Sequence, residues 1–314
     1  MRITFYGNPK KIAEEIKKID PKLILIHKNR EFLVKNFKAG YVYNIFPRLE
    51  NIKGVKKIEA KNHELLPLVY SYKYRFKYPI NPLKKIIIAG PCVIDDWDIF
   101  IKTGFELKKL GVDAIRAPLF KPRSSPYGWE GFGKKGISKL KEARKKLKVP
   151  FVMEVMDYRV IDKLTGVCDI IQIGARNMKN YVLLKEAAAS GLPVLLKRQP
   201  KSNLREFLYS AEYILKYGAK KIILCERGDN LSDGIASINL EIIKRIKKEL
   251  KIPIIADLSH SAKDRKKVIN FAAKTAGISD GVMVETSITP EKSLIDTKQI
   301  IDIETFKKVM NIIR

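Results

Sequence analysis

The feature that most constrains the fold is an alternation of short β-branched apolar runs with stretches of helical period, which begins at residue 85. The stretch NMKNYVLLKEAAASG, for example, has apolar residues at spacings of three and four and ends on a glycine suited to a helix C-cap. Continuous apolar runs are typical of parallel strands covered on both faces. There are eight such runs: residues 85–92, 112–119, 150–157, 169–176, 193–198, 221–228, 253–260 and 280–285. The pattern predicts a closed (β/α)8 barrel over residues 81–314.

Residues 1–80 lack this repeat and predict a separate, smaller domain. The segments RITFYG, NPKKIAEEIKKID, KLILIHK, GYVYNIF and GVKKIEAK indicate an α+β module of ferredoxin-like type. The prolines of YPINPLKK mark a linker to the barrel. Alternatively, the segment is a packing or oligomer-forming extension, on which His27 and His63 are ordinary surface residues.

Composition places the chain among soluble globular proteins. Its 314 residues are 46% hydrophobic, which is ample for a buried core. No apolar run approaches the roughly 20 residues of a membrane span, and the basic start MRITFYGNPKK lacks the apolar centre of a secretory signal. Three scattered cysteines argue against a disulfide framework and fit a reducing compartment. These observations favour a cytoplasmic location.

The net charge of +28 raises the possibility of a nucleic-acid partner. The lysines, however, are spread over helical faces such as IIKRIKKELK and are not grouped with aromatic residues for base stacking. This distribution favours a protein that binds neither nucleic acid nor membrane. A composition rich in lysine and isoleucine also suits a thermophilic source.

Charged or reactive residues follow every predicted strand. Barrel chemistry takes place at the C-terminal ends of the strands, where the loops meet. Surface exposure alone would also place charges there, but it would not predict a cysteine and the only histidine of residues 64–314 at these ends. The residues at the strand ends are Cys92, Arg116, Lys121, Glu154, Arg176, Lys197, Arg198, Glu226, Arg227, Asp257, His260 and Glu285. We therefore expect the active site at this rim.

One subset of these residues suits a metal. Cys92, His260, Glu285 and Asp296 supply a thiolate, an imidazole and two carboxylates, a mixed set that fits a divalent ion such as Mn, Fe, Zn or Co. Singly, Cys92 would more often be a buried core residue and His260 a structural one. The occurrence of all four residue types at one barrel mouth is what indicates a metal site.

A second subset consists of cations. Clustered guanidinium and ammonium groups bind phosphate and carboxylate, so we expect the site to bind small molecules with several negative charges. A metal beside such a pocket suggests Lewis-acid activation of a carbonyl or phosphoryl oxygen. The cations are Arg116, Lys121, Arg123, Arg176, Lys197 and Arg227.

In this order the motifs resemble a known family. IAGPC, RAPLFKPRSSPYGW, EVMD, IQIGARN, LLKR, ILCERG, DLSHS, and VMVE followed by PEKSLID are similar to motifs of the metal-dependent 3-deoxy-D-arabino-heptulosonate-7-phosphate (DAHP) synthases. The resemblance is to the shorter type, related to octulosonate-phosphate synthases, and covers residues 85–314. It implies condensation of phosphoenolpyruvate with erythrose 4-phosphate, the first step of the shikimate pathway.

The resemblance also implies residue roles. Cys92, His260, Glu285 and Asp296 become the metal ligands, and Arg123 with Ser124 contact the phosphate of erythrose 4-phosphate. The KPRS and GARN segments favour this four-carbon sugar. Glu154 orients a water, or it forms a structural pair with an arginine. The residues expected to hold phosphoenolpyruvate are Arg116, Lys121, Arg176, Lys197 and Arg227, with Lys121 and Lys197 also stabilising developing charge.

Other segments depart from the family pattern, among them Arg116-Ala117-Pro118, Gln199, DNLSDGIASIN, DLSH and Glu285-Thr286-Ser287. These changes leave two alternatives: the same chemistry on another aldose phosphate, and a non-catalytic paralogue. Some relatives carry an N-terminal module that mediates feedback by aromatic amino acids, and barrels of this group are commonly tetramers or dimers. We therefore expect a possible aromatic amino-acid effector and a homo-oligomer.

Overall fold

The chain folds into two units, each with its own core. The computed structural model describes residues 1–73, 79–81, 84–121, 123, 125, 127–230 and 236–314. Contacts within the chain divide it into Met1–Ser71 and Tyr72–Arg314. The Tyr72 hydroxyl donates to Lys220 O at 3.2 Å and accepts from Ile222 N at 3.3 Å, so this residue is tied to the second unit. The division falls earlier in the chain than residue 80.

Eight parallel strands of the second unit close into a barrel, which confirms the predicted barrel. Each strand lies within one of the eight apolar runs. The strand order β10-β13-β14-β5-β6-β7-β8-β9 makes β5 and β14 neighbours, so the two ends of the repeat meet and close the sheet. The strands are β5 (Ile86–Gly90), β6 (Ala114–Arg116), β7 (Phe151–Glu154), β8 (Ile170–Ile173), β9 (Val194–Lys197), β10 (Ile222–Glu226), β13 (Ile254–Asp257) and β14 (Gly281–Glu285).

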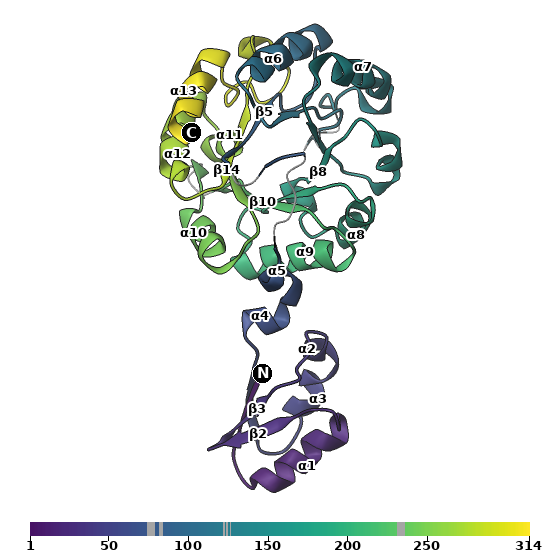
Figure 1. Ribbon diagram of the computed structural model, residues 1–314, viewed down its shortest axis with the longest axis vertical. Coiled ribbons are helices and arrows are strands. Elements are labelled where there is room, and N and C mark those ends of the chain that lie inside the picture. Colours follow the sequence, from purple (N-terminus) through teal and green to yellow (C-terminus); the bar gives the residue numbers. More distant parts are fainter. Residues whose placement is uncertain (74–78, 82–83, 122, 124, 126, 231–235) are drawn as a thin grey trace. The chain divides into compact units, whose positions relative to one another are not determined.

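Helices surround these strands (Figure 1). Several begin at an Asn or Asp whose side chain accepts a hydrogen bond from the first turn, as at Asp96, Asn203 and Asp302. The helices are α6 (Trp97–Lys109), α7 (Ile137–Leu147), α8 (Tyr181–Ala189), α9 (Leu204–Lys216), α10 (Leu240–Glu249), α11 (Leu258–Ala262), α12 (Val268–Ala276) and α13 (Ile303–Ile313). Short 3-10 helices are η1 (Gly133–Gly136), η2 (Tyr158–Val160), η3 (Asp162–Leu164), η4 (Ala175–Asn177), η5 (Arg265–Lys267) and η6 (Pro290–Lys292), and β11 (Asp229–Asn230) pairs with β12 (Ala236–Ser237).

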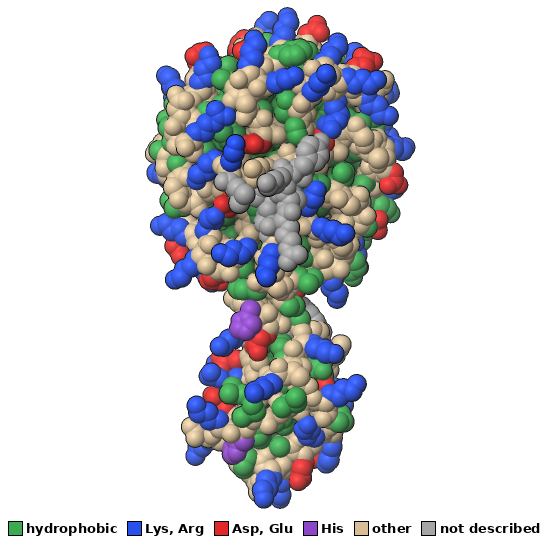
Figure 2. All heavy atoms as spheres, in the orientation of Figure 1, with side chains coloured by type: hydrophobic (Ala, Val, Ile, Leu, Met, Phe, Trp, Pro, Cys, Tyr) green, Lys and Arg blue, Asp and Glu red, His purple; other side chains and the backbone are tan. Residues whose placement is uncertain are grey.

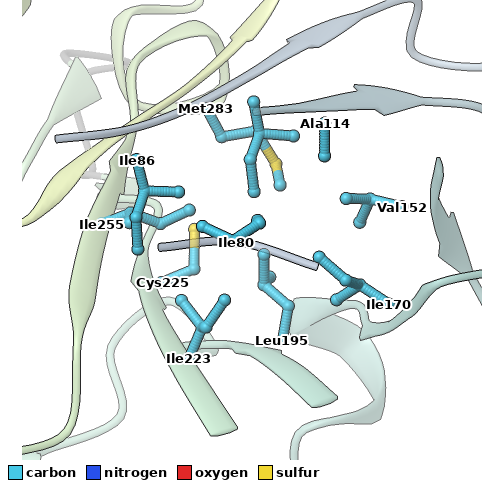
Figure 3. Packing of buried hydrophobic residues seen from close by; sticks show 11 residues of the cluster. Ile80, Ile86, Ala114, Val152, Ile170, Leu195, Ile223, Cys225, Ile255 and Met283 are labelled. Carbon is cyan, nitrogen blue, oxygen red and sulfur yellow. The ribbon is translucent and has the colours of Figure 1, made fainter. Parts of the chain in front are cut away.

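The interior of the barrel is apolar. Side chains from the strands, among them Ile86, Val152, Leu195 and Met283, form one buried cluster. Ile80, which precedes the first barrel strand, lies among them and is only 1% exposed (Figure 3). Ile80 therefore contributes to the barrel core although it precedes the first barrel strand.

The start of the barrel is fixed by aspartates. Asp113, Asp169 and Asp280 each stand immediately before a strand. Each carboxylate accepts a hydrogen bond, of 2.7 to 2.8 Å, from a backbone N–H at the start of the preceding barrel strand. These bonds align neighbouring strands at the N-terminal end of the barrel, opposite to the rim where the active site is expected.

The first unit is a four-stranded antiparallel sheet with helices. Its strand order is β2-β3-β1-β4. Ile3, Phe5, Phe32 and Val34 point to one side of the sheet and pack with Ile16 in a separate core. The elements are β1 (Arg2–Phe5), α1 (Pro9–Ile19), β2 (Leu25–Lys28), β3 (Glu31–Val34), α2 (Tyr41–Asn44), α3 (Phe46–Glu50), β4 (Val55–Glu59), α4 (Asn62–Leu65) and α5 (Pro67–Ser71).

On the surface of the barrel unit, Lys and Arg side chains are scattered around the visible face (Figure 2). This even distribution matches the spread of lysines along the sequence. Among the described residues, no helix has the length and apolar character needed to cross a membrane.

Closure of the barrel depends on a glycine. A Cβ on Gly281, the first residue of β14, would lie 1.9 Å from the carbonyl oxygen of Ile86 on β5. We expect Gly281→Ala to lower the free energy of unfolding by about 3 kcal/mol, because the clash is with backbone that is held in the sheet. Denaturant unfolding measures the change.

Gly277→Ala is the matched control, because a Cβ at that position meets nothing within 4 Å. Equal stability of the two variants would show that β5 and β14 do not approach as closely as described.

Candidate active site

The C-terminal ends of the strands bring the charged residues to one rim. Arg116, Glu154, Lys197, Asp257 and Glu285 are each the last residue of a strand. All five strands are parallel, so these side chains emerge at the same end of the barrel. Charged residues that end separate apolar runs in the sequence are thus brought together in a ring at one end of the barrel.

The four residues predicted to bind a metal lie together. One donor atom from each of Cys92, His260, Glu285 and Asp296 can be chosen so that all four atoms lie within 4.8 Å of one another. Cys92 Sγ is 3.0 Å from Asp296 Oδ2, and His260 Nε2 is 3.5 Å from Glu285 Oε1. Sulfur, nitrogen and oxygen donors at this spacing fit a borderline divalent ion.

A lysine accompanies this cluster. Lys121 Nζ lies 2.6 Å from Cys92 Sγ and 3.2 Å from Asp296 Oδ2. Lys121, the first residue of the KPRS segment, therefore lies directly against the donor atoms, where its ammonium group partly balances their negative charge.

The histidine lies against a buried carboxylate. Asp257 Oδ2 lies 2.9 Å from His260 Nδ1 and 2.5 Å from Lys197 Nζ. The other ring nitrogen, Nε2, is therefore directed toward Glu285 and the cluster. A carboxylate behind a ligating histidine fixes the orientation of the ring.

Nearby basic side chains keep both buried carboxylates ionised. Burial alone would raise the pKa of Glu285, but His260, while it is protonated, and the guanidinium of Arg116 outweigh it, and the pKa falls to about 2. Burial likewise opposes ionisation of Asp257, yet protonated His260 and the ammonium group of Lys197 hold its pKa well below the ordinary value. Both groups carry negative charge at neutral pH.

The other two donors respond differently to burial. Burial lowers the pKa of His260, which favours the neutral imidazole that metals require. Burial, assisted by Glu285, raises the pKa of the Cys92 thiol well above its ordinary value. A metal that binds here would displace the thiol proton.

Arg116 connects the cluster to the barrel interior. Its Nη2 donates to Glu285 Oε1 at 3.1 Å, and the side chain is 2% exposed. Its Nε and Nη1 are buried and have no hydrogen-bond partner among the described residues. Unpaired buried donors on a guanidinium are costly, and an anionic ligand would satisfy them.

A pocket of about 190 Å³ opens beside the cluster. Its lining includes six predicted residues: Lys121, Glu154, Arg176, Lys197, Arg227 and His260. Glu154 Oε2 accepts a hydrogen bond from Gln172 Nε2 at 2.9 Å. Gly174, of the IGARN segment, lies so close to Glu154 that a Cβ there would be 1.9 Å from Oε1. The glycine thus makes room for the carboxylate.

Comparison with known proteins identifies the family. The DAHP synthetase I family matches residues 81–313. The chain belongs to the DAHP synthetase I family. Every residue of the metal-ligand cluster and of the pocket falls within the matched span.

Individual relatives agree with this assignment. The chain is 41% identical over 227 residues to the phospho-2-dehydro-3-deoxyheptonate aldolase of Thermotoga maritima, an alignment that covers 71% of this chain and 67% of the relative. It is 29% identical over 236 residues to a 2-dehydro-3-deoxyphosphooctonate aldolase of Coxiella burnetii, covering 69% and 83% respectively.

Solved structures extend the likeness. A crystal structure of the Thermotoga maritima DAHP synthase superposes with a TM-score of 0.79 at 30% identity, covering 99% of this chain and 94% of that one. A truncated form of the Thermotoga maritima enzyme gives a TM-score of 0.65 at 37% identity, covering 72% of this chain and 84% of that one. The longer match includes the first unit.

Of the two residues predicted to contact the phosphate of erythrose 4-phosphate, the structure describes one. Arg123 is exposed, and its side chain lies over Gly128, where a Cβ would be 2.8 Å from Arg123 Nε. Ser124 lies outside the described residues.

Three residues that contact Glu285 or Glu154 were not predicted from the sequence. Gln299 is 7% exposed and donates to Glu285 Oε2 at 2.7 Å. Ser259 Oγ accepts from the backbone N–H of Glu285 at 2.8 Å, and Gln172 contacts Glu154. All three are neutral polar residues, and their residue type alone does not suggest a role in the site. Gln172 could have been suspected, because it is the one polar residue inside the apolar run IIQI.

The cluster can be tested with cobalt. We expect Co²⁺ to give the near-ultraviolet absorption of a thiolate-bound ion in the wild-type protein, and Cys92→Ala to abolish it. Cys168→Ala serves as the control, because Cys168 is equally buried but lies outside the cluster. Absorption that persists in Cys92→Ala would contradict the assigned ligand set.

Proposed function

We propose that the protein condenses phosphoenolpyruvate with erythrose 4-phosphate to give DAHP and phosphate, the first step of the shikimate pathway. The observation that carries the proposal is the four-residue donor cluster beside a pocket lined by lysines and arginines. Membership of the DAHP synthetase I family and the 41% identity to the Thermotoga maritima enzyme support the choice of reaction.

Cys92, His260, Glu285 and Asp296 would hold a divalent metal, with Mn, Fe, Zn and Co as candidates. Their donor set and spacing fit such an ion. When bound, it would supply Lewis-acid polarisation of the aldehyde carbonyl. Arg116 and Gln299 would hold the Glu285 carboxylate, and Asp257 would orient the imidazole of His260.

The cations of the pocket would bind phosphoenolpyruvate. Lys121, Arg176, Lys197 and Arg227 line the pocket and suit the phosphate and carboxylate of this substrate. Arg116 has two buried nitrogens, Nε and Nη1, without a hydrogen-bond partner in the described part of the chain, and it would contribute a further contact. Arg123 and Ser124 are proposed to contact the phosphate of erythrose 4-phosphate.

In the reaction, C3 of phosphoenolpyruvate attacks the aldehyde carbon, water adds at C2, and phosphate leaves. Lys121 and Lys197 would stabilise the negative charge that develops, because both ammonium groups line the pocket. Glu154 also lines it, and its fixed carboxylate would orient the attacking water. Holding the two substrates together supplies a further large part of the rate acceleration.

The reaction is tested by the loss of phosphoenolpyruvate with erythrose 4-phosphate, with and without Mn²⁺, at elevated temperature. We expect metal-dependent loss in the wild-type protein and none in Cys92→Ala. A folded, metal-loaded protein that consumes no phosphoenolpyruvate with any aldose phosphate would contradict the proposed reaction.

Arabinose 5-phosphate provides the substrate control. Consumption with this sugar alone would assign the chain the chemistry of its octulosonate-phosphate relatives. The higher identity to the heptulosonate enzyme, 41% against 29%, favours erythrose 4-phosphate.

For the first unit we propose a ferredoxin-like fold with a regulatory role. The order β2-β3-β1-β4, with α1 between β1 and β2 and further helices between β3 and β4, supports this fold. An aromatic amino acid is the proposed effector, and a dimer or tetramer the proposed assembly.

Removal of residues 1–71 tests the regulatory role. This end point retains Tyr72 and Ile80, which contact the barrel. We expect the truncated enzyme to keep its activity and to lose inhibition by tyrosine or phenylalanine. The full-length chain is the reference, and inhibition that survives truncation would place the effector site in the barrel.

A further inference from the structure

The least enclosed of the four metal-ligand residues is Asp296. Cys92 and Glu285 are 2% and 0% exposed, whereas the side chain of Asp296 is 31% exposed. Asp296 stands in the long connection between β14 and α13, and its φ of 56° lies in the left-handed region. Non-glycine residues adopt this conformation at an energetic cost, so the surrounding contacts must hold it.

Asp95 provides one of these contacts. It follows Cys92 by three residues, between β5 and α6. Its Oδ2 accepts two hydrogen bonds from the connection, one from Ser293 Oγ at 3.0 Å and one from Leu294 N at 2.9 Å. The segment that carries Cys92 is thereby joined to the segment that carries Asp296.

Apolar packing reinforces the same junction. Ile295, the residue immediately before Asp296, is 3% exposed and packs with Cys92 and Val93, with Trp129 against them. Asp95 and Ile295 thus hold adjacent parts of the connection against the β5 end of the barrel.

The other side of Asp296 is held by the segment that follows α11, the helix that carries His260. The backbone N–H of Arg265 donates to Lys298 O at 2.8 Å, and its guanidinium donates to Thr297 O. Asp296 is therefore bounded by contacts from the segment that carries Cys92 and from the segment that follows α11.

We propose that Asp95 is a positioning residue that holds Asp296 within reach of the other three ligands before the metal binds. This inference rests on the metal site of the proposed function. Residues that support a metal ligand raise the affinity for the metal, because they fix the ligand in advance and so reduce the conformational entropy lost on binding. Asp95 acts through the connection, since both of its bonds go to residues that precede Asp296.

In a simpler alternative, Asp95 acts only as a negative charge near the start of α6. Asp98, in the first turn of α6, carries the same charge and is exposed. Asp98→Ala is therefore the matched control. Asp95→Asn removes the charge of Asp95 but keeps an oxygen that can accept both hydrogen bonds.

Two measurements test the proposal on the full chain. Co²⁺ titration, followed by thiolate-to-metal absorption, gives the affinity of the cluster. Hydrogen exchange at the amides of residues 293–298 in metal-free protein reports whether the connection is held. We expect Asp95→Ala to weaken Co²⁺ binding about 10- to 100-fold and to accelerate exchange in this segment. Asp95→Asn and Asp98→Ala should remain near wild type in both measurements.

Ser293→Ala removes one of the two bonds from the other partner and should show a smaller change in the same direction. Unchanged affinity and exchange in Asp95→Ala would overturn the proposal, as would an equal loss in Asp98→Ala. If wild-type protein shows no thiolate-bound Co²⁺, the metal site of the proposed function fails, while hydrogen exchange still decides whether Asp95 holds the connection.

Discussion

The pairing of β5 with β14 is the interaction on which the rest of the structure depends. These strands come from the two ends of the repeat, and their hydrogen bonds place Glu285 opposite Gly90. Cys92 follows Gly90 by two residues, so closure of the barrel brings the thiol to the carboxylate across nearly two hundred residues of chain. The absence of a side chain on Gly281 permits the approach of the two backbones. Without this pairing the donor atoms of Cys92 and Glu285 would not lie in one cluster.

The closed rim concentrates charge where burial makes it costly. Arg116 pairs with Glu285, and Lys197 with Asp257, all nearly inaccessible to solvent. Buried ion pairs often contribute little net stability, because desolvation offsets their attraction. Their presence at the strand ends is better explained by the proposed chemistry, in which they would hold ionised metal ligands and anion-binding groups in place before substrates arrive. The aspartates at the opposite end of the barrel, bonded to backbone N–H groups, serve alignment of the strands.

Much of this arrangement could be predicted from residue types and spacing. The eight apolar runs predicted the barrel strands, and the parallel barrel predicted that Cys92, Glu154, Lys197, His260 and Glu285 would meet at one rim. Gln299, Ser259 and Asp95 could not be predicted in the same way. Their side chains are common on any surface, and their significance comes from the atoms they contact. The β3 strand was also missed, because its four residues, EFLV, give too short a pattern to separate from the preceding run.

The sequence by itself determined the repeat, the charges at the strand ends and the resemblance to a family. These are local properties of hydrophobic period and residue type, and they persist in any compact arrangement that buries the runs. Only the tertiary structure decided that Lys121 lies against the thiol of Cys92 and that Asp95 bonds to the connection between β14 and α13. These contacts depend on the conformation of long connections, which is set by hydrogen bonds and packing between segments distant in sequence and has no periodic signature.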